Sequence, residues 1–310
     1  MRRRATLLAG LICALAGRIA SGAADGKADL LSKKLEAAIE AEDRAFDGVM
    51  GVAILDLESG LWLLRNADEV FPTASSIKIA VLAELYRQEE QSARGVAGKA
   101  RLGDPYTMDA ADLVEDSRIM AGLTPGVTRV TNRDLATFMV AVSDNAATNV
   151  LIGRLGMENV NQLLRTLGLE QTQLRRKMID LEAARAGREN VATPREMVRL
   201  LEAIYRGKAF GEALTADFTK LLSTRKSSYI ARDLPEEVVV ADKPGDLGGV
   251  RCDSGIVFAH RRPFVISVMT AYARDEPAAE AAIGRIALAA YRHFEQLGRS
   301  SEYGRVLPEP

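Results

Sequence analysis

The sequence predicts an α/β fold, with an antiparallel sheet flanked by helices, that is interrupted by an inserted all-helical domain. Strand-like patterns occur only toward the two ends of the chain, and the long stretch between them is apolar at helical spacing. One discontinuous α/β domain with a helical insertion explains this order simply. The predicted boundaries are residues 24–88 and 225–310 for the α/β domain and 89–224 for the insertion.

The first part of the chain predicts a helix followed by a hairpin. Residues 28–46 carry apolar side chains at helical spacing. Residues 49–57 and 61–64 have strand character on either side of a Glu-Ser-Gly turn, which indicates a β-hairpin. A second helix is expected over residues 76–90.

The insertion shows no convincing strand, and its helices are expected over residues 132–142, 146–155, 158–167, 194–205 and 211–222. Pro194 suits the first position of one of them, behind Thr193 as N-cap. Strand character then returns and a last helix follows; the expected ranges are 238–241, 255–259 and 264–271 for the strands and 276–297 for the helix.

Composition favours a soluble globular protein and gives no reason to expect nucleic acid or an anionic membrane as partner. The 310 residues are 47% hydrophobic and carry a formal net charge of −1. After the N-terminal segment, Cys252 is the single cysteine, so no intramolecular disulfide is expected. His260 and His293 lie far apart in the sequence, and we predict no metal and no cofactor. A monomer is expected.

The N-terminus resembles a secretory signal peptide, predicted over residues 1–23. Residues 2–4 are arginines, residues 5–16 are largely apolar, and residues 21–23 are small. The apolar run is too short for a stable membrane span, although a short uncleaved anchor is the alternative. We therefore expect export, to the periplasm where the source has an outer membrane.

A serine and a lysine three residues apart open the helix that begins near residue 76. Residues at this spacing share a helix face, so the Lys78 amine is expected beside the Ser75 hydroxyl. A neighbouring amine can take the proton that makes a serine a poor nucleophile. The alternative is an N-cap serine with a solvated lysine.

Two further segments carry side chains that could take part in catalysis or substrate binding. Ser143-Asp144-Asn145 lies between two predicted helices and offers a hydroxyl and an amide, or else only caps those helices. Lys243 and Gly245 follow a β-rich run, where the lysine charge and the next backbone N–H can face a bound anion. An ordinary strand end with a turn is the alternative there.

In this order the three segments match the signature S-x-x-K, S-D-N and K-T-G. The residues around these motifs, 72–78, 134–149 and 253–257, also match the sequences that surround the signature. The chain thus resembles the class A serine β-lactamase family, with its β-lactamase and penicillin-binding transpeptidase-like fold, over about residues 30–297. The family's two-domain architecture agrees with the pattern of helices and strands.

The resemblance implies a role for each residue of these motifs. Ser75 would attack a β-lactam carbonyl and form an acyl-enzyme, while Lys78 accepts or relays its proton. Ser143 would protonate the leaving ring nitrogen, and Asn145 would hydrogen-bond a substrate amide. The backbone N–H groups of Ser75 and Asp246 would form the oxyanion hole.

Lys243 would supply positive charge near the substrate carboxylate, and Arg251 would add to that field. A solvated strand-end arginine is the alternative for Arg251. The motif departs from the family at Pro244, which replaces a hydroxyl residue and, lacking an N–H, belongs on an edge or irregular strand position. Asp246 places an acid beside the expected substrate carboxylate, so it weakens penicillin binding or points away.

The family's deacylation residues are not identifiable. Class A enzymes hold the hydrolytic water with an Ω-loop glutamate and an asparagine four residues later, and residues 174–194 contain no such pair. Asp180 or Glu182 is the candidate replacement base, with Asp180 favoured. Both are alternatively surface acids, and Asp180 alternatively forms an ion pair with Arg175 or Arg176.

The sequence therefore predicts a secreted serine β-lactam hydrolase with atypical deacylation. A D-Ala-D-Ala peptidase or an esterase-like acyl-transfer enzyme on the same fold is the alternative. A weakly active binder of cell-wall fragments is a third possibility, and the complete Ser75 and Lys78 pair argues against it. The expected partner is a small β-lactam or a cell-wall peptide.

Overall fold

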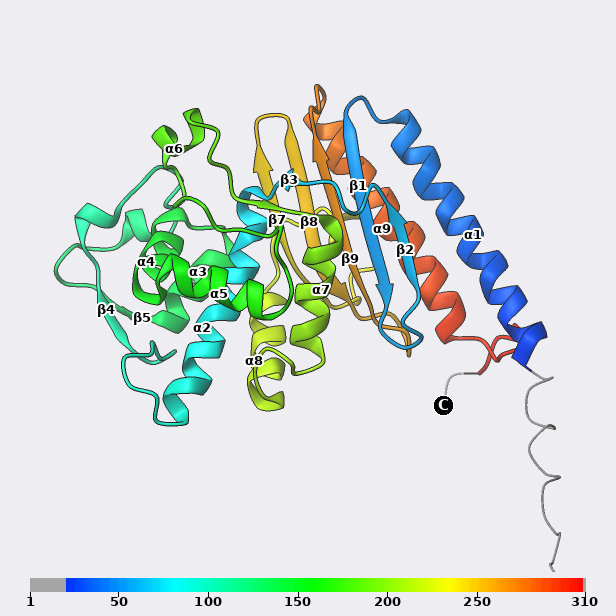
Figure 1. Ribbon diagram of the computed structural model, residues 1–310, viewed down its shortest axis with the longest axis horizontal. Coiled ribbons are helices and arrows are strands. Elements are labelled where there is room, and N and C mark those ends of the chain that lie inside the picture. The colour runs from blue at the N-terminus through cyan, green and yellow to red at the C-terminus, as the bar shows by residue number, and fades with distance from the viewer. Residues whose placement is uncertain (1–20, 309–310) are drawn as a thin grey trace, which may run out of the picture.

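The computed structural model describes residues 21–308, and its centre is a five-stranded antiparallel sheet (Figure 1). The strand order is β2-β1-β9-β8-β7, in which the strands are β1 (Val49–Asp56), β2 (Trp62–Arg65), β7 (Val240–Leu247), β8 (Val250–Val257) and β9 (Phe264–Ala271). The β1–β9 pairing joins the N-terminal hairpin to the C-terminal strands, with Val49 opposite Ala271 and Asp56 opposite Phe264. The predicted discontinuous sheet is confirmed.

Helices cover both faces of this sheet. Helices α1 (Ser21–Ala45) and α9 (Glu276–Gly298) lie side by side on one face, and α7 (Pro194–Tyr205) packs on the other (Figure 1). Because successive strand residues point to opposite faces, Met50 and Val52 of β1 enter the core under α1 and α9. Ala53 of the same strand enters the other core.

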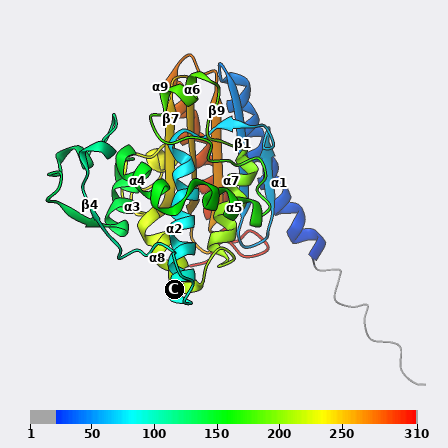
Figure 2. The same ribbon diagram turned by 60° about the vertical axis from the view of Figure 1, so that its left-hand side comes forward.

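The remaining helices form a lobe beside the sheet. They are α2 (Lys78–Ala93), α3 (Asn132–Ala141), α4 (Asn145–Leu155), α5 (Met157–Thr166), α6 (Leu181–Arg185) and α8 (Glu212–Leu222). Both views place α2 between the sheet and the lobe (Figures 1 and 2). Every residue from Lys78 to Tyr86 is buried, which explains why this stretch is apolar apart from Lys78 and Glu84.

The insertion is not purely helical, which corrects the prediction for residues 89–224. It contains a two-stranded sheet of β4 (Pro105–Thr107) and β5 (Arg129–Thr131), and β6 (Val191–Ala192), which pairs with β3 (Phe71–Pro72). Strands of two or three residues are too short for a period of two to be recognised in sequence. The helices predicted there are confirmed to within a residue or two.

Strand β7 is longer than predicted and contains the lysine motif. It continues to Leu247, so Lys243 and Pro244 lie inside the strand and not beyond its end. As the last strand of the sheet, β7 is an edge strand, where proline is tolerated. Residues 1–20 of the predicted leader lie outside the described residues, and no helix within residues 21–308 is long and apolar enough to span a membrane.

Candidate active site

Ser75 lies in a short 3₁₀ turn, η1 (Ala74–Ile77), that leads directly into α2. Ala74 before it has a φ of +47°, which is uncommon for a residue with a side chain. The Ser76 hydroxyl donates a 2.8 Å hydrogen bond to the carbonyl oxygen of Lys243. The turn that carries Ser75 is thereby attached to β7.

The Ser143-Asp144-Asn145 segment connects α3 to α4. Asp144 is the N-cap of α4, accepting from Ala147 N at 3.0 Å, and its other oxygen accepts from Ile119 N and Met120 N at 2.8 and 3.0 Å. The cap interpretation is therefore correct for Asp144. Its neighbour Ser143, at a φ of +60°, lines the active-site cleft.

Ser143 connects the nucleophile to the lysine. Lys78 Nζ donates to Ser143 O at 2.7 Å, Ser143 Oγ at 2.9 Å and Asn145 Oδ1 at 2.9 Å. Ser143 Oγ in turn donates to Ser75 Oγ at 2.9 Å. Ser143 thus bridges Ser75 and Lys78, and the three groups form one continuous chain of hydrogen bonds.

Burial and a neighbouring charge weaken the preference of Lys78 for its charged form. Burial and the charge of Lys243 hold the pKa of Lys78 well below its usual 10.5, although Asp144, Asp246 and Asp116 oppose the shift. Burial also lowers the pKa of Lys243 to about 8. An amine with a depressed pKa loses its proton more readily than a free lysine and can then accept one, as a general base requires.

Ser75, Ser143 and Asn145 line a cleft of about 520 Å³ between β7 and the loop 174–193, whereas Lys78 and Lys243 lie behind its wall. Of the seven non-glycine residues with positive φ in the described range, four line this cleft: Ala74, Asp116, Ser143 and Ile179. Backbone strain of this kind concentrates where surrounding structure holds functional groups in place.

Two asparagines that sequence reasoning did not single out position the loop 174–193: Asn149 attaches the loop to α4, and Asn190 joins two parts of the loop to each other. Asn149, one turn after Asn145 on α4, accepts from Met178 N at 2.8 Å and donates to Met178 O at 3.0 Å. Asn190 Oδ1 accepts from the backbone of Arg175 at 2.7 Å. The four-residue spacing from Asn145 was the one sequence signal for Asn149.

The candidate bases Asp180 and Glu182 are not brought to Ser75. Asp180 is the N-cap of α6 and accepts from Ala183 N at 2.9 Å, and Glu182 is exposed. Neither is among the described residues that line the cleft, where the loop presents Met178 and Ile179 instead. The expectation of a replacement base at Asp180 finds no support in this geometry, because its carboxylate is engaged by its own helix.

The alternative ion pairs proposed for Asp180 are not formed either. Arg176 pairs with Glu189 at 2.7 Å, and both line the cleft. The remaining acids on the cleft wall are Asp116 and Asp246, and Asp246 is exposed.

Gly245 lets β7 approach the nucleophile. A Cβ there would lie 2.6 Å from Thr73 O and 2.8 Å from Ser75 N, closer than side-chain atoms pack. Glycine is thus required where the strand meets the turn. The next residue, Asp246, lines the cleft.

Arg251 does not join the site. Its guanidinium pairs with Glu276 at 2.5 Å and Glu280 at 2.9 Å, both on α9, and it is not among the described cleft residues. The predicted addition to the substrate-binding field is corrected: two carboxylates already neutralise this charge. The alternative of a solvated arginine is also wrong, because the side chain is largely buried.

Comparisons with known proteins agree with this geometry. A model of the family described as "Beta-lactamase enzyme family" matches residues 31–294. β-Lactamase OXY-2 of Klebsiella oxytoca is 31% identical over 248 residues, which cover 78% of this chain and 80% of the relative. A solved β-lactamase from Sphaerobacter thermophilus DSM 20745 is similar with a TM-score of 0.73 and 30% identity, over 83% of this chain and 95% of that one. An ancestral class A β-lactamase is similar with a TM-score of 0.72 and 27% identity, over 84% and 99%.

Proposed function

The chain belongs to the β-lactamase enzyme family, with the class A serine enzymes, and on that premise we propose that it hydrolyses β-lactams through an acyl-enzyme on Ser75. The observation that carries the proposal is the unbroken chain of hydrogen bonds from Ser75 through Ser143 to Lys78. A buried lysine with a lowered pKa at the end of that chain is the base that the reaction needs.

Acylation follows from this chain of groups. In the resting structure the donors run from Lys78 to Ser143 and from Ser143 to Ser75. Once Lys78 has lost a proton, the two hydroxyls turn toward it: the Ser75 proton passes to Ser143 Oγ while the proton of Ser143 passes to Lys78 Nζ, and Ser75 Oγ attacks the lactam carbonyl carbon. The backbone N–H groups of Ser75 and Asp246 hold the developing oxyanion. When the carbon–nitrogen bond breaks, Ser143 returns a proton to the ring nitrogen and is resupplied by Lys78.

We further propose that deacylation is atypical. The loop presents Met178 and Ile179 to the cleft, and Asp180 caps a helix. The loop carboxylate on the cleft wall among the described residues is Glu189, and Arg176 engages it in an ion pair, so neither acid is free to activate water at the ester. Loss of a positioned general base costs about 10²–10⁴-fold in rate. The acyl-enzyme is therefore expected to form readily and to hydrolyse slowly.

The engaged state of the loop carboxylates favours a second candidate, a D-Ala-D-Ala peptidase or esterase-like acyl-transfer enzyme. Without a free base to activate water, the acyl group is retained until another nucleophile arrives. The third possibility, a binder of cell-wall fragments with weak activity, does not need the Ser75–Ser143–Lys78 chain.

Intact-mass measurement distinguishes these functions. Purified protein is incubated briefly and for hours with a penicillin and a cephalosporin while drug loss is followed, with Ser75→Ala as the matched control. A Ser75-dependent adduct that decays as drug disappears supports a β-lactamase, and a persistent adduct supports an acyl-transfer enzyme. Unchanged drug hydrolysis by Ser75→Ala would contradict the mechanism.

The cellular setting is also a proposal. The leader-like residues 1–23 support an exported protein, periplasmic where an outer membrane exists, that works as a monomer. The mass of the mature protein recovered from a periplasmic extract tests the cleavage, because an uncleaved anchor would leave the leader attached. Gel filtration with light scattering tests the oligomeric state.

A further inference from the structure

A second group of buried charges lies directly behind the catalytic strand. Asp242 on β7 and Asp253 on β8 are 1% and 0% exposed. Neighbouring strand residues alternate between faces, so Asp242 points away from the face that bears Lys243 and Gly245. The register places Asp253 opposite Pro244, which puts both acids on this far face.

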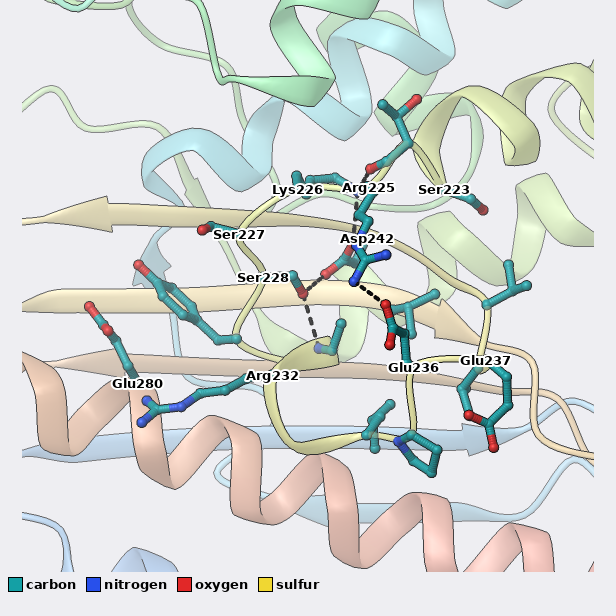
Figure 3. A pocket seen from close by; sticks show the side chains of 18 of the residues that line it. Ser223, Arg225, Lys226, Ser227, Ser228, Arg232, Glu236, Glu237, Asp242 and Glu280 are labelled. Atoms are coloured by element: carbon teal, nitrogen blue, oxygen red, sulfur yellow. Dashed lines mark hydrogen bonds and ion pairs between the residues drawn. The ribbon is translucent and has the colours of Figure 1, made fainter.

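The far face borders a hollow of about 910 Å³ beneath the segment 223–239 (Figure 3). Figure 3 shows Lys226 and Ser228 of that segment converging on Asp242. Lys226 Nζ lies 3.0 Å from Asp242 Oδ1, and the Ser228 hydroxyl hydrogen-bonds Asp242 Oδ2. Lys226 is itself buried, so this ion pair is shielded from water.

Asp253 is held differently. One of its oxygens, Oδ2, accepts from the backbone N–H groups of Tyr229 and Ile230 at 3.0 Å each and lies 3.1 Å from Ser228 Oγ. Its other oxygen, Oδ1, is buried without a hydrogen-bond partner in the described part of the chain. A carboxylate left this way would be costly if it were charged.

The hydrogen bonds of Ser228 indicate that Asp253 carries a proton. A serine hydroxyl has a single hydrogen, and Ser228 directs it to Asp242 while accepting from Ala231 N at 3.1 Å. Its contact with Asp253 Oδ2 is then a hydrogen bond only if Asp253 carries the proton. Burial and the charge of Asp242 raise the pKa of Asp253 well above its ordinary value, in agreement with this arrangement.

The charged groups facing the pair come from four segments. Lys226 comes from the segment after α8, and Lys243 lies on β7. Arg251 on β8 is already matched by Glu276 and Glu280 on α9, and Tyr229 stays neutral because burial raises its pKa. Among the described residues, Lys226 is thus the cation that pairs directly with one of the two acids, Asp242.

We propose that Asp242 and Asp253 share one proton and one negative charge, and that this single charge is the positioning device that keeps Lys243 cationic across the strand. The inference rests on the proposed function, because Lys243 serves that site. Lys243 is 2% exposed, and its ammonium donates to Pro244 O at 2.8 Å. Asp253, Asp242 and Asp246 raise its pKa against burial, and Lys226 lowers it.

A shared charge has a distinctive consequence for substitutions. When either acid becomes asparagine, the other is free to ionise and to pair with Lys226, so the charge behind Lys243 persists. Only the double substitution removes it. Two independently ionised acids would instead contribute separately and additively.

The test measures the rate of Ser75 acylation by a penicillin between pH 6 and 10, in the full-length protein. In the wild type, the rate is expected to fall as Lys243 loses its proton near pH 8. In Asp242→Asn and in Asp253→Asn, this midpoint is expected within about 0.3 pH unit of the wild type, whereas the double variant shifts it downward by about one unit or more. Glu236→Gln removes an exposed carboxylate beside the same hollow and is the matched control.

Two outcomes would overturn the proposal. In the first, each single variant shifts the midpoint pH by a similar amount and the shifts add in the double variant; in the second, the double variant leaves the midpoint pH unchanged. A substrate-free measurement covers the case in which the double variant fails to fold or acylation is absent. Because folding would take up a proton at the pair, the unfolding constant of the wild type relative to Asp253→Asn should rise about tenfold per pH unit from pH 6 to 8. A constant ratio would show that the pair holds no proton, whatever the enzyme acylates.

Discussion

Replacing Gly245 by alanine tests the placement of the oxyanion hole. The added Cβ would lie 2.6 Å from Thr73 O, 2.8 Å from Ser75 N and 2.9 Å from Ser76 N. All three neighbours are backbone atoms, which cannot move aside as a flexible side chain does. Either β7 or the turn that carries Ser75 must therefore shift.

The size of the shift follows from these distances. Ordinary contact begins at 3.4 Å, so relieving the 2.6 Å contact with Thr73 O needs a displacement of 0.8 Å (3.4 − 2.6). That displacement separates Ser75 N–H from Asp246 N–H, the two donors proposed for the oxyanion. A misplacement of about 1 Å costs about 10²-fold in rate, similar to the loss of one oxyanion donor.

Stopped-flow acylation with a chromogenic cephalosporin measures this loss, and intact mass confirms that Ser75 is the labelled residue. Gly248→Ala is the matched control: it lies in the same hairpin, and a Cβ there would meet no atom within 4 Å. We expect acylation to fall about 10²-fold in Gly245→Ala and to change little in Gly248→Ala. Wild-type acylation by folded Gly245→Ala would refute the assignment of this strand to the oxyanion hole.

Four other predictions concern pH and the loop. Acylation should fall above about pH 8 as Lys243, with its pKa near 8, loses its proton, whereas loss of the proton from Lys78 supports the reaction; a stopped-flow pH profile that stays flat from pH 7 to 10 would contradict this. Asp180→Asn should leave the decay rate of the acyl-enzyme within about twofold, because the side chain caps α6; a loss of about 10²-fold by mass spectrometry would restore Asp180 as the base. Met178→Glu should speed that decay at least about tenfold, by placing a carboxylate on the cleft wall, and an unchanged lifetime would show that water activation lies elsewhere. Asn149→Ala removes both hydrogen bonds to Met178 and should lower the free energy of unfolding in urea by about 1–3 kcal/mol. Asn149→Asp should lower it by less, because the aspartate can still accept from Met178 N.

Local sequence determined the elements and the identity of the reacting groups. The Ser75 and Lys78 spacing, the alternation between strands and helices, and proline in an edge strand all follow from interactions between near neighbours in the chain. Short strands such as β4 and β6 escaped prediction because two or three residues carry no measurable period.

Tertiary structure decided which of the motif residues cooperate. Ser143 bridges Ser75 and Lys78 across a separation of 68 and 65 residues, so the bridge depends on how α2 packs against α4. Asp180 and Arg251 have the right chemistry for the site, but a helix N-terminus engages one and two glutamates of α9 engage the other. A side chain's role depends on which partners lie beside it in the folded structure, and spacing along the chain does not contain that information.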